Sequence, residues 1–151
     1  MLQITKKGFT ISEAEEKIGM LNRAGLDVAG FFILGYPGET IGDINDTINF
    51  ACRLPLKRVS FMVFKPFYGT EAGEDIIREM ENKEINWEDF ALNRIVYAPE
   101  GITKKQLKRL RQKALIKFYF RPRIMYDFFR SLKSFSHSRY VFKRAFRWMF
   151  A

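Results

Sequence analysis

The amino-acid sequence predicts an α/β fold. Two apolar runs, residues 28–34 and 58–64, each end in a turn rich in Gly and Pro, as strands of a buried sheet do. Segments with apolar residues at helical spacing precede and separate these runs, and the links between them are short. Such alternation of helix and strand is typical of a parallel sheet with crossover helices.

A first helix is expected between Thr10 and Gly25. Two pairs, Thr10 with Glu13 and Ser12 with Glu15, have the capping-box spacing, in which a hydroxyl accepts a hydrogen bond from the backbone three residues on. The sequence alone does not decide whether Thr10 or Ser12 is the first residue of the cap. The apolar residues that share one face of this helix are Ala14, Ile18 and Leu21.

Residues 28–34 and 58–64 are the predicted strands. The first run is apolar at every position, which predicts a parallel strand that is buried on both faces. Two strands of this kind leave bare sheet edges, and bare edges attract other strands. We therefore expect one strand to be unpaired on one side, which favours self-association or capture of a partner.

Three further helices are predicted. Thr40 caps the helix that ends before Pro55, and its inner face is Ile44, Ile48 and Ala51. Residues 74–84 form a short helix, and the stretch up to residue 100, with Trp87, is rich in loops. Thr103 opens another capping box, and that helix runs to Pro122. Its apolar stripe is Leu107, Leu110, Ala114 and Phe118.

The charge of the chain is unevenly distributed. Residues 1–101 contain 11 Lys/Arg and 16 Asp/Glu, whereas residues 102–151 contain 15 Lys/Arg and one acidic residue. The basic and aromatic tail, residues 123–151, is a candidate for peripheral docking on an anionic membrane. Nucleic acid is the less favoured partner, because no nucleic-acid-binding motif accompanies the tail. No signal peptide or membrane span is recognised, which predicts a cytoplasmic location.

The most informative segment is the turn from Gly30 to Thr40, with the sequence Gly-Phe-Phe-Ile-Leu-Gly-Tyr-Pro-Gly-Glu-Thr. It joins a strand to a capped helix. Glycines let the backbone approach a ligand, and free N–H groups at a helix start favour anions. The same glycines equally serve a tight turn alone. No Gly-Lys-Ser/Thr follows, so this segment is not a P-loop.

Three motifs in this order resemble the C-terminal half of radical S-adenosylmethionine enzymes, most closely the class with a cobalamin-binding domain. They are Lys7-Gly-Phe-Thr10, the Gly30–Thr40 turn and Lys65-Pro-Phe-Tyr-Gly-Thr70, and the similarity extends over residues 1–125. The resemblance implies a partial, incomplete (β/α) barrel. Its last two β/α units occupy residues 1–84, a family-type extension with a helix occupies residues 85–122, and the tail follows.

The resemblance also implies roles for single residues. Those expected against the adenine or methionine portion of S-adenosylmethionine are Ile33, Gly35, Pro66 and Phe67. Those expected to shape the structural turn are Pro37, Gly38, Glu39 and Thr40, with Glu39 bracing it and taking no part in chemistry. Two positions depart from the family pattern, because Phe31 replaces a glycine and Tyr68 replaces a proline.

The family's [4Fe–4S] cluster needs three cysteines, and this sequence contains only Cys52. We therefore assign no metal ligand and no catalytic residue. The resemblance implies a fragment that contributes adenine contacts and part of a substrate pocket, is not catalytic alone, and by itself binds neither S-adenosylmethionine, cluster nor cobalamin tightly. Its expected partner is the N-terminal half of the enzyme or a second copy. The alternative is a non-catalytic module that binds anionic membrane or nucleic acid through the tail.

Overall fold

The computed structural model describes residues 8–81 and 94–131. Its elements, in chain order, are α1 (Ile11–Arg23), β1 (Ala29–Leu34), α2 (Ile41–Arg53), β2 (Arg58–Val63), α3 (Glu74–Glu81), α4 (Lys104–Tyr119) and α5 (Pro122–Ser131). This is the mixed α/β structure that the sequence predicts. Lys7, Trp87 and residues 132–151 lie outside the described residues.

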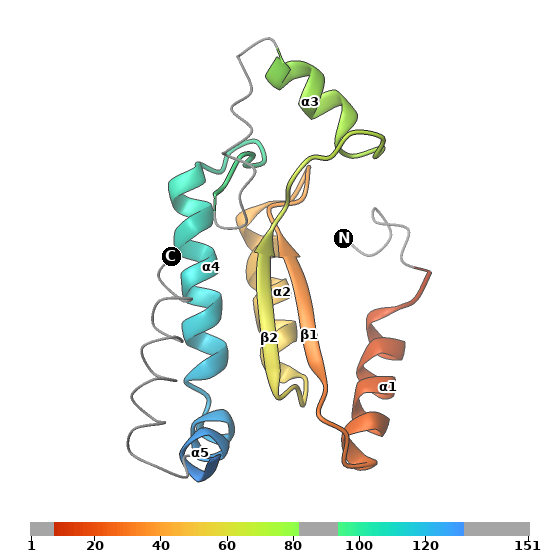
Figure 1. Cartoon of the computed structure of the whole chain (residues 1–151), viewed down its shortest axis with the longest axis vertical. Coiled ribbons are helices and arrows are strands. Elements are labelled where there is room, and N and C mark those ends of the chain that lie inside the picture. The colour runs from red at the N-terminus through yellow and green to blue at the C-terminus, as the bar shows by residue number, and fades with distance from the viewer. Residues whose placement is uncertain (1–7, 82–93, 132–151) are drawn as a thin grey trace.

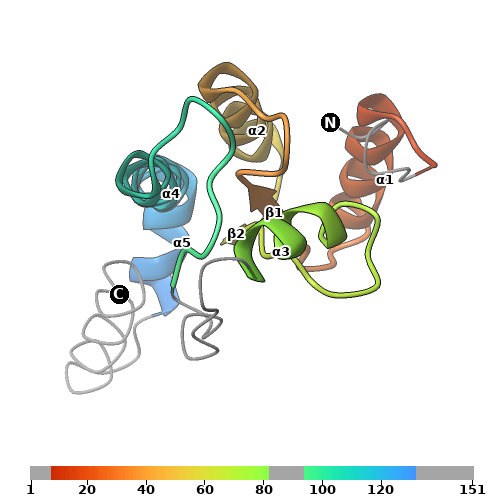
Figure 2. The same cartoon turned by 90° about the horizontal axis from the view of Figure 1, so that it is seen from above.

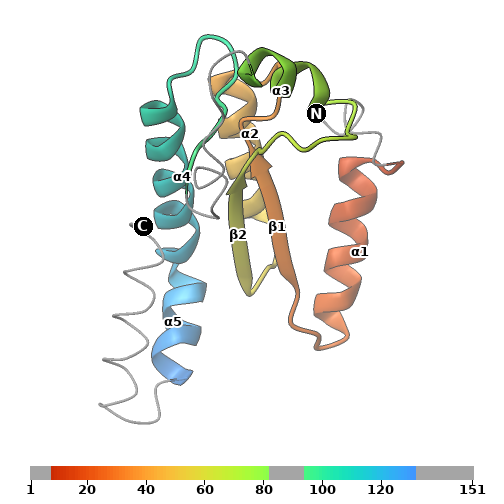
Figure 3. The same cartoon turned by 45° about the horizontal axis from the view of Figure 1, so that its top comes forward.

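Strands β1 and β2 form a two-stranded parallel sheet, which confirms the predicted strand direction. The register pairs Ala29 with Arg58 and Leu34 with Val63. The carboxyl ends of both strands therefore lie at the same end of the sheet, and α3 lies beyond them (Figures 1 and 3). Open parallel sheets bind ligands at this end, so the candidate site is sought there.

Helices α2 and α4 cover one face of the sheet (Figure 2). The predicted apolar stripes supply the core, since Ile44 and Ile48 of α2 meet Leu107 and Phe118 of α4 with at most 1% of each residue exposed. The sheet adds Leu34, Val59 and Phe61. Burial of this apolar face stabilises the packing of α2 and α4 on β1 and β2.

The opposite face of the sheet is open. Phe31 is 73% exposed, Ile33 46% and Met62 42%. The expectation that residues 28–34 are buried on both faces is therefore wrong for the described chain. The run is apolar on both faces, but α2 and α4 lie on the same side of the sheet, and no other described element covers the second side.

The predicted helix starts are confirmed at their caps. Complete capping boxes join Thr10 to Glu13, Thr40 to Asp43 and Thr103 to Gln106. The structure thus selects Thr10 over Ser12 as the cap of α1. Helix α1 lies beside β1 and contributes no buried residue.

Helix α5 is a feature that the sequence analysis missed. Pro122 was expected to end a helix, whereas it is the first residue of the next one, a position where its missing N–H costs nothing. Ile124 is 8% exposed and belongs to the core. Helix α5 therefore packs on the core through Ile124, and it extends across the predicted boundary between the extension and the tail.

Tyr119 of α4 occupies the start of the outer edge of β2, at Val59. The Tyr119 hydroxyl accepts a hydrogen bond from the Val59 N–H (3.3 Å) and donates one to the Val59 carbonyl (2.9 Å). At the other end of the strand, the Phe64 N–H donates to the Leu34 carbonyl (2.8 Å). Alternate residues of a parallel strand direct their backbone N–H and carbonyl groups to opposite sides. The backbone groups of Val59 therefore point away from β1 and towards α4.

The outer edge of β1 is open within the described residues. By the same alternation, the backbone groups of Ala29, Phe31 and Ile33 point away from β2. No hydrogen bond joins these groups to another residue in 8–81 or 94–131. The prediction of one unpaired strand edge is confirmed for this part of the chain, and β1 is the strand concerned.

Candidate functional site

The candidate site begins at the turn that follows β1. Gly35 and Gly38 have φ values of +76° and +80°, which side chains rarely tolerate. A Cβ at Gly35 would also lie 2.6 Å from Cδ2 of Leu107. Gly35 is thus required by the backbone turn and by the close approach of α4, independently of any ligand.

Glu39 braces this turn from inside the fold. It is 1% exposed, and its Oε2 accepts hydrogen bonds from the N–H groups of Gly35 (2.6 Å) and Tyr36 (2.9 Å). Its Oε1 has no hydrogen-bond partner among the described residues. Burial raises the pKa of Glu39 above its ordinary value of 4.5, and the two backbone hydrogen bonds offset part of that rise.

Four amides of this segment already donate to acceptors inside it. The N–H groups of Gly35 and Tyr36 donate to Glu39, the Glu39 N–H donates to the Tyr36 carbonyl, and the Thr40 N–H donates to Asp43. Of the two interpretations of this segment, the geometry favours the tight turn over the anion-binding loop. Hydrogen bonds from Thr40 hold the pKa of Asp43 below its ordinary value, so this carboxylate itself occupies the start of α2.

An aromatic row supports the turn from the neighbouring strand. Phe64, which follows β2, makes edge-to-face contacts with Tyr36 and Tyr97 at centroid distances of 4.9 and 5.7 Å. Such pairs are favourable beyond their burial. They hold the β1 turn, the end of β2 and the segment before α4 in one unit.

The four residues that are predicted to contact S-adenosylmethionine lie in different parts of the structure. Ile33 lies on the open face, directly opposite Met62 of β2. Phe67, in the loop after β2, is 59% exposed, whereas Pro66 beside it is less than 2% exposed and faces the interior. Gly35 lies against Leu107, on the covered side.

Phe31 and Met62 were not named as site candidates, yet they share the open face with Ile33. The signal for Phe31 is its spacing of two residues from Ile33, because alternate residues of a strand share a face. The signal for Met62 appears only once the register of the sheet is known. The open apolar face is thus a surface that the sequence analysis overlooked.

The described residues offer no metal centre. Within residues 8–81 and 94–131, no group of three His, Cys, Asp or Glu side chains lies together. Cys52 is half-buried in α2, and burial raises the pKa of its thiol more than the Arg121 and Lys117 charges lower it. One protonated thiol does not fit an iron–sulfur cluster.

No helix within the described ranges combines the length and the apolar composition that a membrane crossing requires.

Comparison with known proteins places this geometry in context. No protein-family model matches the chain. It is 29% identical to an uncharacterized methyltransferase of Pyrococcus horikoshii over 147 residues, which is 97% of this chain and 31% of that protein. It is 32% identical over 74 residues to the tRNA-2-methylthio-N(6)-dimethylallyladenosine synthase of Alkalilimnicola ehrlichii, and 30% identical over 88 residues to that of Hahella chejuensis.

The synthase matches cover 48% and 56% of this chain. The chain spans less than a third of the methyltransferase and at most a fifth of these two synthases. The chain is therefore similar, over nearly its whole length, to part of a methyltransferase, and over about half its length to part of the tRNA-modifying synthases.

Proposed function

We propose that the chain is the C-terminal part of a radical S-adenosylmethionine enzyme, and that the open face of its sheet packs against the adenine of the bound cofactor. The observation that carries the proposal is the exposed apolar row of Phe31, Ile33 and Met62 on a parallel sheet. The similarity to a methyltransferase over 97% of the chain and the order of the three motifs support it.

The residues present fit an adenine ring better than an anionic group. Phe31, Ile33 and Met62 offer apolar surface to a planar base, and Phe67 extends this surface beyond the strand end. In this enzyme class, reductive cleavage of bound S-adenosylmethionine supplies a carbon radical that removes a hydrogen atom from the substrate. This chain's contribution is to bind and orient the base and to exclude water from it.

The iron–sulfur cluster does not fit this chain, because its only cysteine is the half-buried Cys52 of α2. The proposal therefore assigns the cluster to a polypeptide segment that precedes these elements. On this proposal that segment adds its strand at the open outer edge of β1, because Tyr119 of α4 already bonds to Val59 on the outer edge of β2. On this proposal residues 1–84 end a partial barrel and α4 belongs to its C-terminal extension. Cobalamin use and methyl transfer to substrate remain part of the same proposal.

The alternative function, docking on anionic membrane, rests chiefly on the tail, of which residues 132–151 lie outside the described chain. The described segment 104–131 adds ten Lys/Arg and only Asp127 as an acidic residue. Basic residues on α4 and α5 are equally expected on a surface that faces only water. The exposed apolar face of the sheet therefore supports cofactor binding more strongly than these charges support membrane docking.

Replacing Ile33 with Glu tests the proposal. The chain is combined with a polypeptide that carries the Cys-x-x-x-Cys-x-x-Cys loop, and binding of S-adenosylmethionine is measured by equilibrium dialysis with labelled cofactor. A carboxylate against adenine loses apolar contact and must be desolvated, so we expect affinity to fall at least about tenfold, or roughly 1.4 kcal/mol. Release of 5′-deoxyadenosine falls with it.

The matched control is Ile116→Glu on α4, because Ile116 is 40% exposed and Ile33 is 46% exposed. The control complex is expected to bind S-adenosylmethionine as the wild type does. Equal affinity for Ile33→Glu and Ile116→Glu would reject the assignment of adenine to the open face.

A further inference from the structure

Helix α4 has a row of exposed side chains on the side that is turned away from the sheet. The row, called here the outer stripe of α4, consists of Lys105, Arg109, Lys113, Ile116 and Phe120. These residues follow one another at spacings of three or four, so they share one face of the helix. All of them are exposed, whereas the buried residues of α4 occupy the opposite face.

The positive charge of this stripe is not balanced by carboxylates close to it in the sequence. Residues 104–131 contain ten Lys/Arg and one acidic residue, Asp127, which pairs with Lys57 (2.7 Å). Among residues 8–81 and 94–131, no ion pair involves Lys105, Arg109 or Lys113. Residues 8–81, in contrast, contain 7 Lys/Arg and 12 Asp/Glu. Positive charge is therefore concentrated on α4 and α5.

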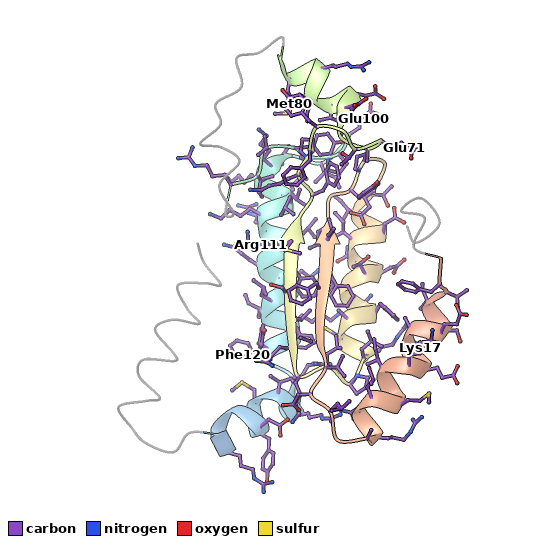
Figure 4. The ribbon with its side chains drawn as sticks, turned by 45° about the vertical axis from the view of Figure 1, so that its right-hand side comes forward. Lys17, Glu71, Met80, Glu100, Arg111 and Phe120 are labelled. Atoms are coloured by element: carbon purple, nitrogen blue, oxygen red, sulfur yellow. The ribbon has the colours of Figure 1, made fainter. Side chains whose placement is uncertain are left out.

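Exposed apolar side chains distinguish this surface from one that faces only water. Ile116 is 40% exposed and Phe120 is 65% exposed, and Figure 4 shows Phe120 where α4 ends. Helix α5 repeats the pattern, because Tyr126 is 65% exposed and shares one face of the helix with the exposed Arg123 and Arg130. Single exposed apolar residues are ordinary, whereas several among clustered cations mark an interaction surface.

We propose that the outer stripe of α4 docks the protein on the surface of an anionic membrane. Anionic headgroups attract the three cations of the stripe, and Ile116 and Phe120 enter the boundary between headgroups and acyl chains. Nucleic acid offers the same phosphate charge, but the aliphatic side chain of Ile116 gains nothing from stacking on bases, so a lipid surface fits better.

The docking surface is separate from the surface proposed for adenine. Helix α4 packs on the covered side of the sheet and turns its outer stripe away from it, whereas Ile33 and Met62 lie on the open side. A membrane on the outer stripe therefore leaves the open face of the sheet free. The inference does not depend on the proposed function.

Co-sedimentation of the full chain with lipid vesicles tests the docking surface. Vesicles of phosphatidylglycerol and phosphatidylcholine in equal parts are expected to bind the protein, and added salt weakens this binding. Arg109→Gln/Lys113→Gln is expected to lower the partition coefficient about tenfold, since each cation near such a surface contributes up to about fivefold. The control Lys17→Gln/Arg23→Gln removes the same charge from exposed positions of α1, across the sheet from α4 (Figures 1 and 2). Its partition coefficient is expected to change less than about twofold, because screening limits attraction to nearby charges.

Phe120→Ser tests the apolar part of the stripe. Loss of the ring from the membrane boundary is expected to weaken binding to the anionic vesicles at least about fivefold, and Phe120→Trp is expected to bind at least as tightly as the wild type. The control Phe9→Ser removes an exposed ring next to α1 and is expected to leave binding unchanged. If Phe120→Ser does not fold, Ile116→Ser is compared with Ile11→Ser, because these residues are 40% and 51% exposed.

Several results would overturn the proposal. Equal weakening by Arg109→Gln/Lys113→Gln and by Lys17→Gln/Arg23→Gln indicates attraction by net charge alone. Equal binding to vesicles of phosphatidylcholine alone excludes recognition of anionic lipid, and wild-type binding by Arg109→Gln/Lys113→Gln excludes the outer stripe. Tighter binding to polyuridylate than to the anionic vesicles, with the same loss in Arg109→Gln/Lys113→Gln, assigns the stripe to nucleic acid and rejects the membrane.

Discussion

Replacing Arg121 with Ala is expected to lower the free energy of unfolding by about 3–4 kcal/mol. Its guanidinium donates hydrogen bonds to the carbonyl groups of Cys52, Leu54 and Leu56, where α2 ends and the chain enters β2. It also lies 3.9 Å from the ring centroid of Phe118. The substitution removes the donor that these carbonyls share and the stacking on the core, and urea denaturation measures the loss.

Two further variants separate this clamp from a general charge effect. Arg123→Ala removes an exposed cation of α5 and is expected to change stability by less than about 0.5 kcal/mol. Arg121→Lys keeps the charge, but a single ammonium does not reproduce the planar fork, so about 2 kcal/mol is expected to be lost. A loss below about 1 kcal/mol for Arg121→Ala would contradict the role of Arg121 as the link between α4–α5 and the sheet.

Replacing Glu39 with Ala is expected to cost about 3 kcal/mol, because the buried N–H groups of Gly35 and Tyr36 lose their acceptor. Glu39→Gln keeps an acceptor oxygen in the same place, and its loss is expected to stay below about 1 kcal/mol. Thermal and urea unfolding of the three proteins at neutral pH measure both values. A Gln variant as unstable as the Ala variant would show that the carboxylate charge, rather than the acceptor, holds the turn.

The pH dependence of the Glu39 variants has a defined sign. Because burial raises the folded-state pKa of Glu39, the native protein binds a proton more readily than the unfolded chain does. This contribution is fully present below the ordinary value of 4.5 and is lost as pH rises through the raised pKa. Glu39→Gln is therefore expected to gain stability relative to the wild type over that interval. Parallel stability curves for the two proteins would contradict the raised pKa.

The sequence by itself determined the elements that depend on short-range interactions. The caps at Thr40 and Thr103 each involve a partner three residues away, so the sequence alone indicates them, and for α1 it left the choice between Thr10 and Ser12 to the structure. The apolar stripes of α2 and α4 follow the helical period in the same way. The bracing of the β1 turn by Glu39, which the family resemblance implied, is also a short-range interaction, since its partners are three and four residues away.

Only the tertiary structure decided which surfaces are covered and which are open. The run at residues 28–34 is apolar on both faces, and the placement of α2 and α4 on one side leaves Phe31 and Ile33 exposed. Tyr119 reaches Val59 across 60 positions of sequence, and Arg121 reaches Cys52 across 69. Tyr and Arg side chains at such positions look like ordinary helix residues, because their partners are set by how α4 and α5 pack against the sheet. Local propensity and periodicity carry no information on that packing.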